Sequence, residues 1–358
     1  MPVGARRTAG RAAGGRLLLA TAVALALALV APLRAAAETT SAHDIVAGWK
    51  GEHALLGTIL RTRDGALFRP VQGGGASAEA ALLDWLESAA APFILLGEVH
   101  DNAGHHRFRA ALIDALARRG GNRSARPALV FEQIRADKQA VLRDFAASGG
   151  GSAEALMTRL EWEKSGWPAA ALFKPLFVTA LARGLSITAG DVPRARMREI
   201  VRSGAAILPA EERTALHLDT PLAKPLRDAL LDELEEGHCK LVARERLTGM
   251  VLAQRLRDAH LARALVAARQ GGAQAILLAG NGHIRRDRAV PWYLARMQPD
   301  ARIVIVQLAE VASGRSEASD YVPRQPDGSP AVDFVVFTPR TTRPDPCVAL
   351  REHFKRRR

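Results

Sequence analysis

The chain has 358 residues and a formal net charge of +13, and hydrophobic residues make up 48% of it. This length suits one large domain, or a domain with an insertion. A basic surface can attract anionic lipid, nucleic acid or an acidic small molecule. The export signal predicted below argues against nucleic acid as the partner.

The first 37 residues are predicted to be a cleavable secretory signal peptide. Four arginines within the first 16 residues precede an apolar stretch at 17–30, and the alanines at 35–37 offer a small-residue cleavage site. The apolar stretch is shorter than the roughly 18 residues expected of a membrane-spanning helix, although an uncleaved anchor remains the alternative. Without this segment the net charge falls to +8, because it carries five arginines and no acid. We therefore expect a periplasmic protein.

The cysteines bear on anchoring and on redox state. No cysteine precedes Cys239, so none is placed for acylation after the signal, and we expect a protein that is not lipid-anchored. In an exported chain, Cys239 and Cys347 would most simply form a disulfide that ties the C-terminal tail to the body. Two unpaired thiols are the alternative.

Strand and helix patterns alternate along the chain. In order, the first half predicts a β-hairpin at 55–61 and 66–71 around an Asp64-Gly65 turn, a loop at 73–75, a helix at 78–89, a strand at 93–96, a helix at 105–119, and strands at 128–131 and 185–189. Residues 197–270 are charged and helical in pattern, with no convincing strand. Strands at 275–278, 301–308 and 333–338 follow, with a loop at 313–330.

This order predicts an α/β fold with a mostly parallel sheet, flanked by helices and carrying a smaller helical insertion or cap. The expected division is an α/β core at 38–196, the helical insertion at 197–270, and a second part of the core with a basic C-terminal tail at 271–358.

Polar residues follow several predicted strands. A Gly-x-x-His motif comes directly after two of them, at 97–100 and 280–283, and the first contains Glu98. Ligands of open α/β sheets gather at the carboxyl ends of parallel strands, so His100 and His283 are predicted to be neighbours. Two other strands are followed by Glu132 and by Asp191 and Arg194. Such a cluster could bind a metal, act as acid and base, or ligate a haem iron.

Residues beside the two motifs are further candidates. Arg285 follows the second motif, and Tyr293 lies in the next predicted helix. An arginine can pair with a ligand carboxylate while an aromatic ring covers an apolar face; a solvated charge run beside core aromatics is the alternative. His105 and His106 either orient the His100 loop or form a solvated helix start.

Several segments together carry a family resemblance: residues 97–102 with His105 and His106, 131–133 with Asp137, 165–168, 190–194, and 280–285. In these segments the chain resembles the ChaN-like haem-binding family, whose members are often lipoproteins tied to bacterial iron uptake. The two motifs are also similar to the wider superfamily of Tiki-type proteases, TraB-like proteins and erythromycin esterases. Two positions depart from the family pattern: Arg109 stands where Gln is expected, and Phe173 where relatives often carry Tyr.

The resemblance implies a haem-binding protein of iron uptake that binds haem as a homodimer, with the envelope uptake machinery as a possible partner. As candidate haem-binding residues we take His100, His283 or Tyr293 for the iron, and Arg285 and Arg194 for the propionates. The wider superfamily implies instead a hydrolase, in which Glu98, His100 and His283 would ligate a divalent metal ion and Glu132 would assist. A third possibility is an envelope interaction protein that keeps the scaffold without a working site.

Overall fold

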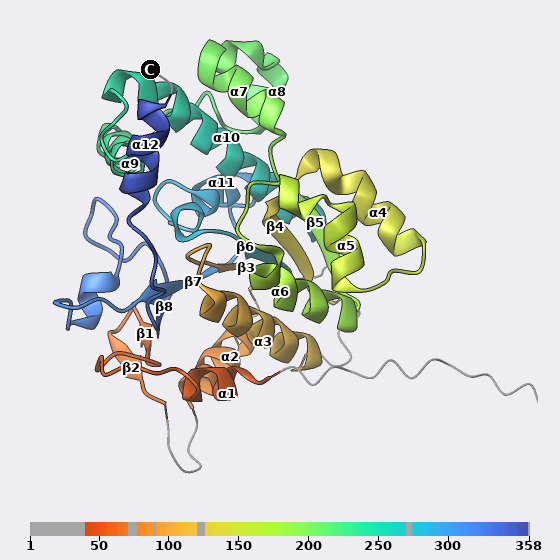
Figure 1. Cartoon of the computed structure of the whole chain (residues 1–358), viewed down its shortest axis with the longest axis vertical. Helices are drawn as coiled ribbons and strands as arrows, with labels where there is room; N and C mark the ends of the chain where they lie inside the picture. Colours follow the sequence, from red (N-terminus) through yellow and green to blue (C-terminus); the bar gives the residue numbers. More distant parts are fainter. Residues whose placement is uncertain (1–39, 71–76, 89–90, 120–125, 270–273, 357–358) are drawn as a thin grey trace, which may run out of the picture. The chain divides into compact units, whose positions relative to one another are not determined.

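The computed structural model describes residues 40–356, apart from 71–76, 89–90, 120–125 and 270–273, and its strands form an eight-stranded sheet (Figure 1). The expected signal peptide and the loop predicted at 73–75 lie outside the described residues. The strands are β1 (Ile59–Arg61), β2 (Ala66–Phe68), β3 (Phe93–Leu96), β4 (Ala128–Arg135), β5 (Ser186–Asp191), β6 (Ala275–Leu278), β7 (Ile303–Glu310) and β8 (Phe334–Thr338).

The strand order is β2-β1-β8-β7-β3-β6-β4-β5. The six strands from β8 to β5 pair in parallel, whereas β1 runs antiparallel to both β8 and β2. The mostly parallel sheet is therefore confirmed, and so is the hairpin, in which Arg61 pairs with Ala66. Gly65 takes a positive φ of 72° in its turn, a conformation that glycine adopts without strain.

Three predicted strand ends are too early, and one of them is that of β7, which runs on to Glu310. β4 continues through Glu132 to Arg135, and β5 continues to Asp191. The reason is the pairing of these two strands, which resumes between Arg135 and Asp191 after a register shift. A register shift of this kind turns the side chains beyond it in a new direction, so polar residues can occupy the end of a paired strand.

Helices cover both faces of the sheet (Figure 1). The α-helices of the described residues are α1 (Ala42–Ala47), α2 (Ala78–Ser88), α3 (Ala103–Arg119), α4 (Gln139–Ala147), α5 (Ala153–Arg159), α6 (Ala170–Ala182), α7 (Arg194–Ser203), α8 (Ala210–Ala215), α9 (Lys224–Gly237), α10 (Arg244–Ala268), α11 (Val290–Met297) and α12 (Pro346–Lys355). Ile94 and Leu96 of β3 pack in the core formed with α2, α3 and α6. Phe93 and Leu95 pack in the opposite core, with α10 and α11. Burial on both faces explains why the central strands are continuously apolar.

The segment 197–270 is helical in its described part. α9 and the start of α10 share a small core of their own, which includes Leu230, Leu231 and Leu247. The later part of α10 packs on the sheet, since Leu256 and Leu261 belong to the core beneath β3 and β6. α10 thus connects the helical part to the sheet. None of the described helices combines the length and apolar character needed to cross a bilayer.

Cys239 and Cys347 form a disulfide, with their sulfur atoms 2.02 Å apart. The predicted pairing is confirmed, and the alternative of two unpaired thiols is wrong. The bond joins the start of α12 to the chain just after α9, beside which α12 lies (Figure 1).

Candidate functional site

The two Gly-x-x-His motifs meet at the carboxyl edge of the sheet. β3 and β6 are neighbouring parallel strands, with Leu96 opposite Leu278, so the following turns leave the sheet side by side. A Cβ atom at Gly97 would lie 2.2 Å from Oδ1 of Asn281, and one at Gly280 would lie 2.7 Å from Cε1 of His100. Each motif's glycine therefore makes room for a side chain of the other motif.

Glu98 is the centre of what we call the His100 cluster, which comprises Glu98, His100, His106, Arg109 and Gln133. Its side chain is buried, and its Oε1 lies 2.7 Å from Nδ1 of His100 and 3.0 Å from Nε2 of Gln133. Oε2 accepts from Arg109, whose guanidinium is also buried and reaches the carbonyl oxygen of Leu96 at 3.2 Å. The carboxylate and the guanidinium neutralise each other, which makes burial of both tolerable.

The protonation of His100 follows from these contacts. A carboxylate can only accept, so Nδ1 carries the proton that faces Glu98. Burial lowers the pKa of His100, and the ring is therefore neutral near pH 7. Its Nε2 then holds a lone pair, and 39% of the side chain is exposed. His100 is an imidazole with a fixed tautomer and a nitrogen available to a ligand.

His105 and His106 are fully buried, so the prediction of a solvated helix start is wrong. His106 lies 2.9 Å from the carbonyl oxygen of His100, and His105 accepts from the backbone N–H of Val99 at 2.9 Å. Burial lowers the pKa of His105 to about 3 and that of His106 to about 4. Both are neutral side chains that hold the backbone of the His100 loop.

The second group of polar residues is the His283 cluster, which comprises Glu132, Asp191, Arg257, Asp258 and His283. His283 lies between two carboxylates, with Nδ1 2.6 Å from Asp258 and Nε2 3.1 Å from Glu132. Arg257 of α10 reaches Glu132 at 2.7 Å and Asp191 at 2.9 Å. The backbone N–H of Gly280 donates to Glu132 at 2.7 Å, so Gly280 touches both clusters.

His283 and Glu132 of this cluster are ionised, whereas burial raises the pKa of Asp258. Burial disfavours the charged imidazole, but Glu132 and Asp258 together raise the pKa of His283 to about 10. Burial likewise opposes the charge on Glu132, yet His283 and Arg257 hold the pKa of that carboxyl well below its usual range. A protonated His283 with both nitrogens paired has no lone pair to offer a ligand.

Trp167 contacts His100, and Arg194 contacts the loop that precedes Trp167. The Trp167 ring stands edge-on to the His100 ring, with centroids 4.8 Å apart. Arg194, at the exposed start of α7, donates to the carbonyl oxygen of Ser165 in the loop before Trp167. The structure thus places the Trp167 ring beside the His100 imidazole and Arg194 at the loop that carries Trp167.

Tyr293 and Arg285 take other positions. Tyr293 is fully buried in α11, and its hydroxyl accepts from Nε of Arg255 at 3.1 Å. Arg285 pairs with Asp287 at 2.7 Å and donates to the carbonyl oxygen of Arg324. Their described contacts engage the tyrosine hydroxyl and the guanidinium away from His100.

The residues expected to ligate a metal belong to different clusters. Glu98 and His100 are paired with each other, and His283 is paired with Asp258 and Glu132. Within the described ranges, no three His, Cys, Asp or Glu side chains are grouped as a metal ion would require.

Several site residues were not found from the sequence. Arg109 was noted only as a departure from the family pattern, yet it neutralises Glu98. Arg257 and Asp258 lie within the charged helical segment that was predicted as an insertion. The sequence carries one signal, the three-residue spacing of Arg255, Asp258 and Leu261, which places them on one helix face; the structure buries all three.

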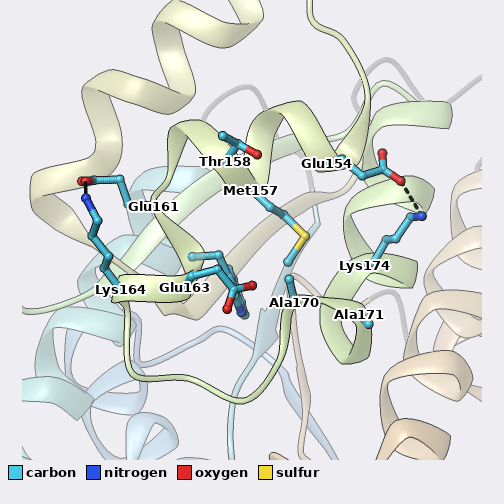
Figure 2. A pocket seen from close by; sticks show the side chains of 10 residues that line it. Glu154, Met157, Thr158, Glu161, Glu163, Lys164, Ala170, Ala171 and Lys174 are labelled. Carbon is cyan, nitrogen blue, oxygen red and sulfur yellow. Dashed lines mark hydrogen bonds and ion pairs between the residues drawn. The ribbon is translucent and has the colours of Figure 1, made fainter.

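A separate pocket of about 570 Å³ opens between α5, α6 and the turn at Trp162–Lys164 (Figure 2). Met157 points into it beside Ala170, and Trp162 completes its apolar lining. Ion pairs at the rim join Glu161 to Lys164 at 2.9 Å and Glu154 to Lys174. Trp162 also lines a cavity of about 10 Å³ that reaches Gln133 of the His100 cluster.

Comparison with known proteins places this site in a family. The sequence profile described as "Haem-binding uptake, Tiki superfamily, ChaN" matches residues 85–294, more than half of the chain. The chain belongs to this family. The match includes both Gly-x-x-His motifs, and it ends before the strands β7 and β8.

The fold of this ChaN family member is similar to that of a solved structure. ChaN of Campylobacter jejuni, in a structure of cofacial haem binding, is 21% identical, covering 78% of this chain and 95% of its own, with a TM-score of 0.57. A mutant of the erythromycin esterase EreC in its open conformation is 16% identical, covering 74% of this chain and 80% of its own, with a TM-score of 0.38. The type III effector HopBA1 is 14% identical, with coverages of 76% and 97% and a TM-score of 0.37. The comparison with curated proteins found no match.

Proposed function

We propose that this ChaN family member binds haem at the carboxyl edge of its sheet and that Nε2 of His100 ligates the iron. The observation that carries the proposal is the state of His100, which is neutral, partly exposed, and held by Glu98 through its other nitrogen. A carboxylate on the far nitrogen fixes the orientation of a ligating histidine and raises its basicity.

The surroundings of His100 fit a haem. Trp167 offers an aromatic ring next to the imidazole, and Arg194, at the loop before Trp167, offers a cation for a propionate. Arg257 adds positive charge. Burial lowers the pKa of the His100 imidazole most, and the charges of His283 and Arg257 lower it further, against the opposing charge of Glu132. Bound haem would supply an iron centre; the residues of the chain hold its ligand in place and match its charge.

The other predicted ligands fit less well. Both ring nitrogens of His283 are paired with carboxylates. Tyr293 is buried and bonded to Arg255, and burial raises the pKa of its hydroxyl, which disfavours a phenolate. We therefore place His100 before His283 and Tyr293 as the iron ligand.

The proposal extends to location and assembly. The Cys239–Cys347 disulfide supports an oxidising compartment, and with the expected signal peptide it supports the periplasm. From the family we further propose a role in iron or haem uptake, with haem binding accompanied by homodimerisation. Sedimentation of the protein with and without haem tests assembly, because a doubling of mass that depends on haem is expected.

The direct test is a haem titration of residues 38–358 followed by absorbance. We expect a saturable Soret shift that is lost in His100→Ala and kept in Tyr293→Phe. His43→Ala is the matched control, because His43 is exposed and pairs only with Glu79 in its described contacts. Absence of a Soret shift, with a metal found by elemental analysis, would refute haem binding and favour the hydrolase.

A further inference from the structure

The chain after β8 crosses the His100 loop. We call residues 339–345 the C-terminal strap. Arg343 of the strap binds Asp101 through two hydrogen bonds, Nε to Oδ2 and Nη2 to Oδ1, both 2.8 Å long. The same guanidinium binds Glu310, at the end of β7, through hydrogen bonds of 2.8 and 2.7 Å. One arginine thus joins the residue that follows His100 to the end of the neighbouring strand.

Asn102 makes a second connection between the loop and the strap. Its side-chain nitrogen donates to Glu310 at 2.8 Å and to the carbonyl oxygen of Pro339 at 3.0 Å. Its side-chain oxygen accepts from the backbone of Gly104 at 2.9 Å, at the start of α3. The strap, the His100 loop and α3 are therefore held by one connected set of hydrogen bonds.

Charge strengthens this arrangement. Burial opposes ionisation of Glu310, but its hydrogen bonds from Arg343 and Asn102 lower its pKa to about 2. Arg343 is only 27% exposed, so its contacts with the two carboxylates are partly shielded from water. Bidentate arginine–carboxylate contacts fix geometry as well as charge.

Both ends of the strap are anchored. It begins after Thr338 of β8, whose hydroxyl lies 2.7 Å from Nε2 of His105. Beyond it, Cys347 is joined to Cys239. A segment fixed at both ends can hold Asp101 in one position.

We propose that Arg343 is a positioning residue, which holds the turn at 99–102 and thereby sets the His100 imidazole for its ligand. The inference rests on the proposed function of His100 in haem binding. Arg343 lies outside the residues that match the family profile, so this role concerns the chain itself.

The test compares Arg343→Gln with Arg340→Gln, because Arg340 is an exposed arginine of the same strap outside these contacts. Loss of a supporting contact behind a metal ligand weakens binding by roughly tenfold or more. We expect that rise in the haem dissociation constant, with a changed Soret maximum, in Arg343→Gln only. The haem dissociation constant of Arg343→Lys should lie between those of Arg343→Gln and Arg340→Gln. Asp101→Asn should weaken haem binding in the same way while leaving the Arg343–Glu310 pair intact. This variant therefore still tests the inference if Arg343→Gln fails to fold.

A second measurement needs no haem. Imidazole NMR signals of His100 in the haem-free protein should shift in Arg343→Gln and Asp101→Asn and stay unchanged in Arg340→Gln. Unchanged His100 signals together with wild-type haem affinity, whatever the melting temperature, would overturn the inference. If the wild type gives no Soret shift, the proposed function fails instead, and the NMR comparison still decides whether Arg343 positions His100.

Discussion

Replacement of His283 by glutamine tests the electrostatic account of the site. The imidazole is buried, 2.6 Å from Asp258 and 3.1 Å from Glu132. Glutamine has a similar size but no charge, so His283→Gln leaves Asp258 without its cationic partner. Removing one partner of a buried ion pair costs roughly 3–5 kcal/mol.

The pKa of His283 gives a second value for the free energy with which His283 stabilises the fold. Relative to the ordinary value of 6.5, the two carboxylates raise it to about 10 in the folded chain against the opposing effect of burial. At about 1.4 kcal/mol per pH unit, this difference corresponds to a ceiling of about 5 kcal/mol. Because the folded pKa is raised, the stabilisation is fully present below pH 6.5 and is lost as the pH rises toward 10.

The assay is urea unfolding of the wild type and the variant between pH 6.5 and 9.5. The wild-type free energy of unfolding, minus that of His283→Gln, should fall by about 1.4 kcal/mol per pH unit. Taking the difference removes titrations that both proteins share. The double variant Asp258→Asn/His283→Gln should recover part of the loss, because it no longer buries an unpaired carboxylate.

Two results would refute this reasoning. One is a difference between wild type and variant that stays constant from pH 6.5 to 9.5, which would mean that His283 is neutral in the folded protein. The other is a decrease of less than about 1 kcal/mol in the free energy of unfolding of His283→Gln at pH 6.5. That result would mean that other groups stabilise the two carboxylates.

Other predictions address the site geometry, the pocket and the disulfide. Gly280→Ala should weaken haem binding roughly tenfold, because its Cβ would lie 2.7 Å from the His100 imidazole. Gly282→Ala, whose Cβ meets nothing within 4 Å, should bind haem as the wild type does. Equal haem affinities of the two variants would contradict the packing argument. Ala171→Trp, at the rim of the pocket of about 570 Å³, should leave the haem titration unchanged. Loss of the Soret shift in this variant would indicate that haem binds in that pocket instead. Reduction of the Cys239–Cys347 bond, whose cysteines are 108 residues apart, should lower the free energy of unfolding in urea by about 4–5 kcal/mol. A double serine variant should be insensitive to reductant, and an equal response would assign the effect elsewhere.

The alternation of apolar strands with amphipathic helices was sufficient to predict the parallel sheet. β3 and β6 were readable because a strand buried on both faces must be apolar throughout. The two Gly-x-x-His motifs pointed to the candidate functional edge, since ligands of open α/β sheets gather at the carboxyl ends of the strands. These features are local in sequence, which is why they could be read from it.

The pairing within the site was decided only by the tertiary structure. Sequence treated His100 and His283 as equivalent, whereas packing gives His100 an exposed neutral ring and places His283 between two buried carboxylates. Asp258 of α10 supplies a second carboxylate at His283, and the strap brings Arg343 to Asp101, the residue after His100. Both are far from the motifs in sequence, and which of their side chains reaches a motif depends on how a helix or a chain end packs against the sheet.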